Sequence, residues 1–597
     1  MTRSAVFATA GHVDHGKSAL VRALTGIEPD RWDEERRRGM TLDLGFAWTT
    51  LAEQVDVAFV DVPGHERYVP TMLAGAGSVA GVLFIVAADE GWAAQSTEHL
   101  EGLRALGVRD GILVITKSDL MEPELAEAEA RERLDDAGFA GIRSVAVSAL
   151  TGAGLDELRA EMLALARRLP EPHPDGDVRL WLDRSFSISG AGTVVTGTLT
   201  DGTLRVGDEL ELRGLQGADP RRVRIRGLQT AGQERESVSG ASRVAVNLRN
   251  VPPHEAPRGS QLLSPDAFLR PEVIDVRLDA DRDRMPAACV VHIGTASLQA
   301  RLRPLDAHHM RMTFDVPLPV RIGDRMVLRD PGQHIVLGAA VVLDPDPPAL
   351  RRRGAAKHRA AALTEYSTAP DAAVLLRDKR LVRIDVLRKM GCVALPAAID
   401  GWCLDPSYRK VLESQLADLV AADVQADADS RGVSLGAAQR HLDLPSRAVL
   451  LELLTDDLTV TDGHIVSEHH AVMSPASTAA MQRFAVEVAG KRFYSPEAPR
   501  LRELGLDAST LGVLCRHGHL VDLGRGIYLT PDAIEEAATL LSALDGAFSL
   551  GEARIALGTT RRIAVPLMEH LQRTGRTRRM GGDKHAIRPP STEGETR

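Results

Sequence analysis

Short apolar runs alternate with more polar segments over the first 170 residues. The runs lie at residues 5–8, 55–60, 81–88, 111–115 and 145–150, and a segment of helical character at 19–24 follows the first of them. Runs of this length, separated by longer polar segments, predict the strands of a doubly wound parallel sheet. The chain is therefore expected to begin with an α/β domain, at residues 1–170.

The pattern changes near residue 178 to short alternating strands separated by glycine and aspartate turns. Predicted strands lie at 180–186, 193–199, 208–212, 223–228 and 242–248, and a further β-rich stretch runs from 273 to 343. Proline-rich segments at 170–174 and 345–348 mark linkers on either side. Strands at this spacing predict two compact β-barrels, at residues 175–268 and 270–346.

Helical patterns replace the strands after residue 354, and a short two-stranded turn recurs among them. The turns lie at 398–403, 460–465, 523–528 and 581–587. They stand about sixty residues apart, which suits three helices closed by a β-wing. This favours four tandem winged-helix modules, at residues 355–411, 412–472, 473–531 and 532–590, over an irregular helical bundle.

Composition narrows the classes of protein. The chain has 597 residues, 44% of them hydrophobic and 26% charged, as in ordinary soluble proteins. Its formal net charge of −10 excludes a protein surface that is basic throughout, so any surface that binds nucleic acid must be local. The longest apolar run, 79–88, is about half a membrane span, and the 4 cysteines show no metal-ligand spacing. We expect a cytoplasmic monomer with no membrane partner.

The segment from Gly11 to Ser18 carries the clearest chemical signal, because it matches G-x-x-x-x-G-K-[ST] between the first strand and the first helix. Glycines let backbone N–H groups surround phosphate oxygens beside the positive end of a helix. Lys17 would contact the outer phosphates and Ser18 would bind Mg²⁺; a surface turn with a stray lysine is the alternative. The predicted phosphate-binding residues are Gly11, His12, Val13, Asp14, His15, Gly16, Lys17 and Ser18.

Two further loops carry groups suited to a nucleotide switch. The charged segment 30–41 ends in Thr41, whose hydroxyl could complete a Mg²⁺ shell. The strand at 55–60 is followed by Asp61, Gly64 and His65. The Asp61 carboxylate can hold a Mg²⁺ water, the Gly64 N–H can reach a γ-phosphate, and His65 would lie beside the reacting group. A solvated loop and an ordinary polar histidine are the alternatives.

The last two strands of the first domain end in residues suited to a guanine base. Asp119 can accept both hydrogens of the amino face, and the stem of Lys117, after Thr116, can lie along the ring. The N–H of Ala149, after Ser148, could meet the guanine oxygen. Loops at the carboxyl ends of parallel strands form one crevice, so these segments predict a guanine-nucleotide site.

Together these segments resemble the guanine-nucleotide motifs of translational GTPases. The forms G-H-V-D-H-G-K (11–17) and D-x-P-G-H (61–65) are particular to elongation and initiation factors that carry tRNA. The resemblance implies GTP/GDP and Mg²⁺ as cofactors, a metal held by Ser18, Thr41 and Asp61, and ribosome-stimulated GTP hydrolysis. It also implies that His65 orients the hydrolytic water and that Val13 helps to gate it.

The segment R-G-M-T-L-D-L-G-F (38–46) resembles the selenocysteine-specific elongation factors, as does Thr116, which stands where most GTPases have asparagine. Loss of that asparagine would remove a side-chain brace, so we expect GDP to leave unaided. Residues 190–198 and 321–329 resemble the second and third domains of translational GTPases. The second domain of that family cradles the aminoacyl end of tRNA.

If the tRNA carries selenocysteine, that barrel must distinguish a selenol from a serine hydroxyl. A selenol is an anion at neutral pH, unlike a serine hydroxyl, so discrimination calls for a fixed cation, ideally an arginine braced by a carboxylate. The adjacent residues Asp183 and Arg184 on the first barrel strand fit this need, and Arg249 is another candidate. Each of these arginines could instead be an ordinary surface charge.

Basic residues outnumber acidic ones between residues 551 and 588, although the whole chain is acidic. Thr559 and Thr560 would cap the third helix of the last module, and the wing would follow it. An anionic nucleic acid is expected on this face, with a merely solvated basic face as the alternative. The predicted RNA-binding residues are Arg561, Arg562, Arg573, Arg576, Arg578, Arg579 and Lys584.

Winged helices attached to a translational GTPase resemble the carboxyl-terminal extension of the bacterial selenocysteine factors, which binds an mRNA hairpin beside a UGA codon. The resemblance implies selenocysteinyl-tRNA, the mRNA hairpin and the ribosome as partners. Two alternatives stay open: another tRNA-carrying GTPase, such as an initiation factor subunit, and a nucleotide-regulated DNA-binding regulator. The sequence thus predicts a multidomain chain with a P-loop GTPase domain, two β-barrels and four winged-helix modules.

Overall fold

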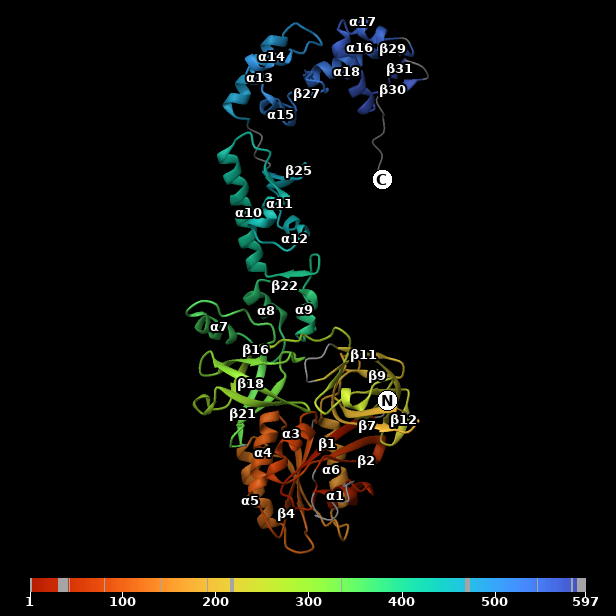
Figure 1. Cartoon of the computed structure of the whole chain (residues 1–597), viewed down its shortest axis with the longest axis vertical. Helices are drawn as coiled ribbons and strands as arrows, with labels where there is room; N and C mark the ends of the chain where they lie inside the picture. Colours follow the sequence, from red (N-terminus) through yellow and green to blue (C-terminus); the bar gives the residue numbers. More distant parts are fainter. Residues whose placement is uncertain are drawn as a thin grey trace. The chain divides into compact units, whose positions relative to one another are not determined.

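The computed structural model describes residues 3–29, 41, 43–79, 81–139, 141–190, 192–214, 220–333, 335–467, 473–544, 546–580 and 584–587. These residues belong to two units, Met1–Cys403 and Leu404–Arg597, whose elements are labelled in Figure 1. The boundary between the units falls inside the range 355–411 that the sequence pattern assigns to one module. Most of the predicted switch segment, residues 30–40, lies outside the described residues.

A six-stranded sheet in the order β2-β3-β1-β4-β5-β6 organises the first domain. Neighbouring strands pair in parallel, except that β2 runs antiparallel to β3. The strands are β1 (Ser4–Ala10), β2 (Gly45–Leu51), β3 (Val55–Asp61), β4 (Gly81–Ala87), β5 (Asp110–Thr116) and β6 (Arg143–Ala146). The predicted α/β class is confirmed. Strand β2 was not predicted from the sequence, and the prediction that Ser148 and Ala149 belong to the last strand was wrong, because β6 ends before them.

Helices cover both faces of this sheet because its central strands are apolar on both sides. In β1, Val6 and Ala8 enter one apolar core, whereas Ala5 and Phe7 enter the other. The first core packs α3 (Val69–Ala76), α4 (Ala94–Leu106) and α5 (Glu124–Asp136), and the second packs α1 (Lys17–Thr25) and α6 (Leu155–Arg168). Figure 1 shows α4 and α5 on one side of the sheet and α1 and α6 on the other.

The next segment forms an antiparallel sheet in the order β10-β15-β7-β8-β14-β11-β12, with an additional β10–β11 pairing that connects strands from its two sides. The predicted strands are confirmed, with slightly longer bounds for most of them. The elements are β7 (Arg179–Ile188), β8 (Gly192–Leu199), β9 (Thr203–Arg205), β10 (Glu209–Arg213), β11 (Arg221–Thr230), β12 (Gln233–Arg235), β13 (Ser237–Ser239), β14 (Ser242–Leu248) and β15 (Gln261–Leu263).

The β-rich stretch after residue 273 closes into a barrel in the order β16-β19-β18-β17-β20-β21. Its core also receives Trp181 from β7, so the two β domains share apolar contacts. The strands are β16 (Val273–Asp279), β17 (Ala288–Ile293), β18 (Ala296–Pro304), β19 (His309–Phe314), β20 (Arg325–Arg329) and β21 (Val336–Asp344).

A small helical segment packs directly on this barrel. It comprises α7 (Ala355–Leu363), α8 (Ala372–Lys379), β22 (Leu381–Arg383), α9 (Ile384–Lys389) and β23 (Trp402–Leu404), and β22 pairs with β23. Ile322, from the loop before β20, is buried in the same apolar cluster as Leu376, Leu387 and Met390. The N–H of Ile322 donates to the carbonyl of Met390 at 3.1 Å. The segment is therefore part of the unit that holds the barrel.

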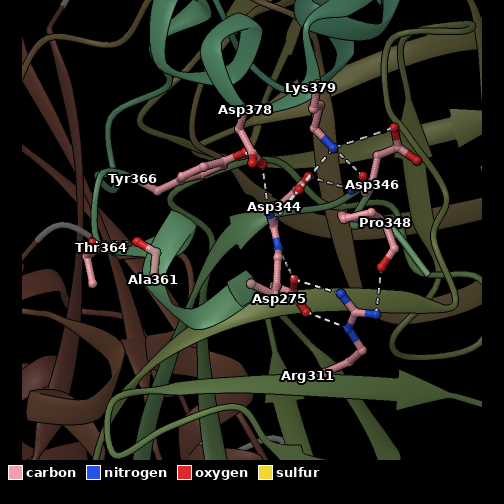
Figure 2. A network of polar contacts seen from close by, with 11 residues as sticks. Asp275, Arg311, Asp344, Asp346, Pro348, Ala361, Thr364, Tyr366, Asp378 and Lys379 are labelled. Carbon is pink, nitrogen blue, oxygen red and sulfur yellow. Dashed lines mark hydrogen bonds and ion pairs between the residues drawn. The ribbon is translucent and has the colours of Figure 1, made fainter. Parts of the chain in front are cut away.

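Buried charges join the same helices to the barrel (Figure 2). Asp275 of β16 and Asp344 at the end of β21 are both 0% exposed. Arg359 of α7 donates to both carboxylates. Arg311 of β19 holds the other side of Asp275, at 2.7 and 2.9 Å, and Lys379 of α8 lies 2.9 Å from Asp344. Ion pairs with so little access to water fix the orientation of α7 and α8 on the barrel.

The second unit contains three helical segments, each with a small antiparallel sheet. The first has α10 (Pro406–Ala426), β24 (Val433–Ser434), α11 (Leu435–His441), α12 (Arg447–Leu451), β25 (Leu458–Thr461) and β26 (His464–Ser467). The second has α13 (Pro475–Val488), α14 (Ala498–Glu503), α15 (Ala508–Arg516), β27 (Val521–Asp522) and β28 (Tyr528–Leu529). The third has α16 (Pro531–Ser542), β29 (Phe548–Ser549), α17 (Leu550–Ala556), α18 (Arg561–Arg573), β30 (Thr577–Met580) and β31 (Lys584–Ile587).

The predicted two-stranded turns can be compared with these sheets. In the turn at 460–465, Val460 pairs with Ile465 in the β25–β26 hairpin, and the turn at 523–528 joins β27 to β28. In the turn at 398–403, Ile399 and Trp402 form an isolated bridge, and the longer pairing is that of β22 with β23. Residues 581–583 of the last turn lie outside the described part of the chain.

Two smaller predictions concern cysteines and membranes. All the cysteines are free thiols; Cys289, Cys392 and Cys403 are buried and Cys515 is half-buried, as expected of small hydrophobic side chains. Among the described residues, every helix is too short or too polar to span a bilayer.

Candidate functional site

The loop between β1 and α1 has the geometry of a phosphate cradle. Gly11 has φ +132°, and a Cβ there would lie 2.1 Å from the carbonyl oxygen of Ile85. Gly16 adopts the left-handed conformation at the N-cap of α1. Lys17 is buried, and its Nζ donates to the carbonyls of Gly11 at 3.2 Å and His12 at 2.7 Å. The ammonium is thus held across the mouth of the loop, at the positive end of a helix.

The predicted metal ligands converge beside this loop, although they come from three separate segments. The hydroxyl of Ser18 donates to Asp61 Oδ2 at 2.6 Å and lies 3.0 Å from the hydroxyl of Thr41. Thr9 donates to the other oxygen of Asp61 at 2.7 Å. A carboxylate and two hydroxyls are hard oxygen donors of the kind that Mg²⁺ prefers, and Mg²⁺ takes few protein ligands when phosphates supply the rest. The residues present therefore fit a magnesium nucleotide.

Burial governs the charge of the carboxylate in this cluster. Asp61 is 0% exposed, and this burial raises its pKa above the ordinary value. Hydrogen bonds from Ser18 and Thr9 and the positive charge of Lys17 act in the opposite direction. A divalent cation at the same place would further favour the ionised carboxylate.

The segment after β3 packs tightly on the phosphate loop. A Cβ on Gly64 would lie 2.4 Å from Lys17 Nζ and 2.6 Å from the Cα of Val13, so only glycine fits there. His65 is half-buried; its Nδ1 accepts from the N–H of Arg67 at 3.2 Å, and its ring meets Tyr68 edge-on. The Nδ1 acceptor role leaves the proton on Nε2.

Two buried histidines support the loop. His99 of α4, which sequence reasoning missed, is 0% exposed, and its Nδ1 accepts from the N–H of Gly11 at 3.1 Å. His15 is equally buried and lies 3.2 Å from the carbonyl of Ile85. Burial lowers the pKa of His15 to about 4 and that of His99 to about 3. Both rings are therefore neutral at physiological pH; a lone histidine within a helical segment gave no signal of this role.

The residues predicted to read guanine lie after β5 and β6. The hydroxyl of Thr116 donates to the carbonyl of His15 at 2.7 Å. Threonine thus ties the strand end to the phosphate loop, and unaided release of GDP stays a prediction. Lys117 has φ +54° and pairs with Glu90 at 2.6 Å. Burial lowers the pKa of Lys117, but its bonds to acidic partners raise it overall.

The other residues predicted to bind the guanine base differ in their exposure to solvent. Asp119 is exposed, so its carboxylate is accessible to a bound base. Asp14 in the phosphate loop is exposed as well. Ser148 is buried, and its hydroxyl accepts from the N–H of Thr151 at 3.1 Å, which shapes the turn containing Ala149. The side chains that could meet the base thus stand at the ends of adjacent strands.

The second domain contains the carboxylate-braced arginine that a selenolate would need, but not the one predicted. Asp183 accepts from Arg243 at 2.7 Å through Oδ1 and also contacts it through Oδ2. Thr196 donates to the same Oδ1 at 2.7 Å. Arg184 instead donates to the carbonyl of Leu44 in the first domain. The predicted pairing of Asp183 with Arg184 was wrong, because Asp183 lies at an irregularity of β7 and its carboxylate bonds to Arg243 of β14 instead.

A cavity of about 800 Å³ opens in the same domain, and Arg249 is on its wall. Asp183 and Arg184 are not part of the wall. The lining residues are Ser187, Gly192, Thr193, Arg226, Leu248, Arg249, Asn250, Val251, Pro252 and Pro253.

The predicted RNA-binding residues form two groups in the last segment. One group is exposed on α18, β30 and β31: Arg561, Arg573, Arg578, Arg579 and Lys584. The other group comprises Arg562, which is also exposed, and Arg576, which is half-buried. Arg576 pairs with Glu535 of α16, and Arg562 donates to the carbonyl of Ser495.

The start of α18 differs from the expectation. Thr560 occupies the N-cap position, but its side chain makes no capping hydrogen bond. The hydroxyl of Thr559 donates instead to the carbonyl of Phe493, 66 residues earlier in the chain. Arg561 and Arg562 nevertheless begin the helix, as predicted.

Models of known protein families match separate segments of this chain, and these segments correspond to the domains described above. Residues 2–168 match the model described as elongation factor Tu GTP binding domain, and residues 192–263 match elongation factor Tu domain 2. Residues 274–349 match the beta-barrel domain of selenocysteine-specific elongation factor, and residues 539–586 match elongation factor SelB, winged helix.

Full-length relatives are similar along almost the whole chain. The selenocysteine-specific elongation factor of Haemophilus influenzae is 30% identical, over 98% of this chain and 99% of its own. That of Escherichia coli is 29% identical, over 98% of each chain. A crystal structure of a bacterial selenocysteine-specific elongation factor, EF-Sec, is 25% identical with a TM-score of 0.76, and the match covers 98% of this chain and all of that one.

Proposed function

Because the chain belongs to the selenocysteine-specific elongation factors, we propose that it binds GTP with Mg²⁺, carries selenocysteinyl-tRNA to the ribosome, and releases it when GTP is hydrolysed. Delivery would occur at UGA codons marked by an mRNA hairpin. The protein would act as a cytoplasmic monomer. The proposed domains have the boundaries predicted from the sequence, and the four helical segments would be winged-helix modules.

The nucleotide site supports the first part of this proposal. Ser18 and Thr41 would hold Mg²⁺ directly and Asp61 would hold one of its waters, while Lys17 would neutralise the outer phosphates. Bound Mg²⁺ would neutralise charge that develops on the phosphates. Gly64 lies next to Lys17, with no room for a side chain between them. Its N–H would donate to the γ-phosphate. Thr116, Lys117, Asp119, Ser148 and Ala149 would hold the base.

Hydrolysis would depend on positioning rather than on covalent chemistry. His65 would present its protonated Nε2 toward the attacking water, with Val13 at the gate, once the ribosome has oriented the ring. The Nδ1 bond to Arg67 supports this tautomer. Substitution of His65 by alanine should leave GTP binding intact and abolish ribosome-stimulated hydrolysis.

The buried pair of Asp183 and Arg243 carries the selenocysteine part of the proposal. Asp183 orients the Arg243 guanidinium through two contacts, and an anion would approach the remaining edge of the guanidinium. The guanidinium groups of Arg184 and Arg243 both lie over the ring of Phe46, so Arg184 could contribute a second positive charge. A selenolate gains from both charges, whereas a serine hydroxyl gains little.

Competition between selenocysteinyl-tRNA and seryl-tRNA for the GTP-bound protein tests this pocket. Arg243→Met should reduce the preference for selenocysteine by about a hundredfold, the value of one charge-assisted hydrogen-bond pair. Arg301→Met, which removes an exposed arginine from the third-domain barrel, serves as the control for general loss of positive charge. An unchanged preference in Arg243→Met would refute the assignment.

The last segment supports the mRNA partner. Its exposed arginines on α18 and the wing would contact the hairpin phosphates, and the other segments would act as spacers. An initiation-factor-like GTPase would have no use for this face. A DNA-binding regulator would prefer duplex DNA to an RNA hairpin when affinities for the full-length chain are compared at the same salt concentration.

A further inference from the structure

The ring of Phe46, in the first domain, lies against both arginines of the second-domain pocket. The Arg243 guanidinium carbon is 3.7 Å from the ring centroid, and that of Arg184 is 4.7 Å from it. Phe46 is only 7% exposed, so water does not compete for the ring. Cation–π contacts are strongest where they are desolvated in this way. One aromatic residue therefore fixes both cations.

The same short segment also reaches the metal ligands. Thr41, five residues before Phe46, lies 3.0 Å from Ser18. Between them, the carbonyl of Leu44 accepts a hydrogen bond from Arg184. A Cβ on Gly45 would lie 2.9 Å from Pro29 and 3.1 Å from the Cβ of Asp61. The backbone from 43 to 46 is thus wedged between the proposed magnesium site and the arginines.

An ion pair adds to this connection. Asp43 lies 3.2 Å from Arg258 and 3.7 Å from Arg184, both in the second domain. Arg258 also donates to the carbonyl of Thr71 in α3 at 3.4 Å. The contacts of the segment with the second domain therefore combine charge, a backbone carbonyl and an aromatic face.

We propose that Phe46 is a positioning residue that makes the pocket's preference for a selenolate depend on the bound nucleotide. The inference rests on the proposed function. Arginine side chains are flexible, and a ring that holds two of them reduces the freedom that binding must remove. When the third phosphate is absent and Thr41 is no longer drawn toward the metal, the segment shifts. The two guanidinium groups then lose their common support, and the selenolate is held less tightly.

Core packing alone does not require an aromatic residue at this position. Phe46 pairs with Val60 across β2 and β3, and it shares its apolar cluster with Leu44, Val60 and Val62. A leucine would also be apolar in that cluster but has no π face for the arginines. The two functions of the side chain can therefore be separated by substitution.

Trp48 offers a matched control. It lies on the same face of β2, two residues further along, and also contacts the second domain. Its ring lies 3.1 Å from the position that a Cβ on Gly232 would take, whereas the cation–π contacts of Arg184 and Arg243 are made to Phe46. Replacement of Trp48 by leucine removes an aromatic contact between the domains without touching the pocket.

The experiment uses the full-length protein with Mg²⁺ and either a non-hydrolysable GTP analogue or GDP. Dissociation constants are measured for selenocysteinyl-tRNA and seryl-tRNA with wild type, Phe46→Leu and Trp48→Leu. In the GTP form, Phe46→Leu should lower the preference for selenocysteine about tenfold, the value of the cation–π contacts. Affinity for the GTP analogue should stay within about twofold of wild type, which shows that the first domain is folded. Phe46→Met, which also lacks a ring, replaces Phe46→Leu if the leucine variant does not bind nucleotide.

The possible results separate this inference from the function on which it rests. If Trp48→Leu keeps the preference and the Phe46 variant loses it only in the GTP form, the coupling is supported. If the Phe46 variant keeps the preference while Arg243→Met loses it, the pocket stands and the coupling is wrong. If wild type binds both tRNAs equally in the GTP form, the proposed function fails and the coupling fails with it.

Discussion

Replacement of Arg359 by methionine should release α7 from the third-domain barrel. Arg359 is 4% exposed, and its guanidinium donates to three carboxylates, at 2.7 Å to Asp275, at 2.6 Å to Asp378, and to Asp344. Figure 2 shows these carboxylates facing one another between the barrel strands and the helices. Methionine replaces the aliphatic stem of arginine but cannot donate a hydrogen bond or carry a charge.

The size of the effect follows from what the carboxylates retain. Removal of one partner from a buried ion pair costs about 3–5 kcal/mol, because the other charge stays buried. Asp275 would keep its bonds from Arg311 and Asp344 its contact with Lys379, so the lower end of that range applies. We therefore expect a loss of about 3 kcal/mol in the free energy of local opening, or about a hundredfold in the opening equilibrium.

Hydrogen exchange followed by mass spectrometry measures this opening without requiring two-state unfolding of a multidomain chain. Peptides from α7 should exchange about a hundredfold faster in Arg359→Met, with little change in the first-domain sheet. Arg301→Met is the control, because Arg301 and Asp315 form an exposed pair at 3.5 Å on the same barrel and should contribute less than about 1 kcal/mol. Exchange in α7 that changes by less than threefold would refute the reasoning.

Three further predictions concern the nucleotide domain and the tail. Thr116→Val, which removes the bond to the phosphate loop but keeps the shape, should speed GDP dissociation about tenfold in stopped flow, whereas Thr116→Ser should not; equal rates would contradict the brace. His99 is neutral in the folded state with a pKa near 3, below its unfolded value, so its contribution to stability is complete above pH 6.5 and is lost as the pH falls. The Tm of wild type should therefore fall between pH 7 and pH 5 more steeply than that of His99→Gln. Parallel curves of Tm against pH would exclude this histidine as the cause. Arg578→Ala should weaken RNA-hairpin binding and its salt dependence more than Arg576→Ala, whose side chain is held by an acidic partner; filter binding that ranks them the other way would argue against the exposed face.

The nucleotide crevice could be predicted from sequence because phosphate chemistry requires particular residue types at fixed positions along the chain. Gly11, Lys17 and Ser18 are close in sequence, and Asp61 follows a strand that the apolar pattern identifies. Topology then brings Thr41 to Ser18, as a shared metal shell requires. Fold and site agree here because each loop starts where a strand of one sheet ends.

The second-domain pocket could not be predicted in the same way. Asp183 and Arg243 are 60 residues apart, and only the folded sheet brings them together. Adjacency in sequence suggested Arg184 instead, but in the folded chain Arg184 donates to the carbonyl of Leu44. Long-range pairing likewise gives Arg576, one of the predicted RNA-binding residues, an acidic partner 41 positions earlier. A single sequence contains no record of such contacts.

The central claim is that the third phosphate of a guanine nucleotide determines whether the chain holds its charged tRNA. The most direct measurement is the affinity of the full-length protein for selenocysteinyl-tRNA with Mg²⁺ and either a GTP analogue or GDP. Tight binding with the GTP analogue and much weaker binding with GDP is the predicted result. Equal affinity in the two states, or no binding of the GTP analogue at all, would contradict the account.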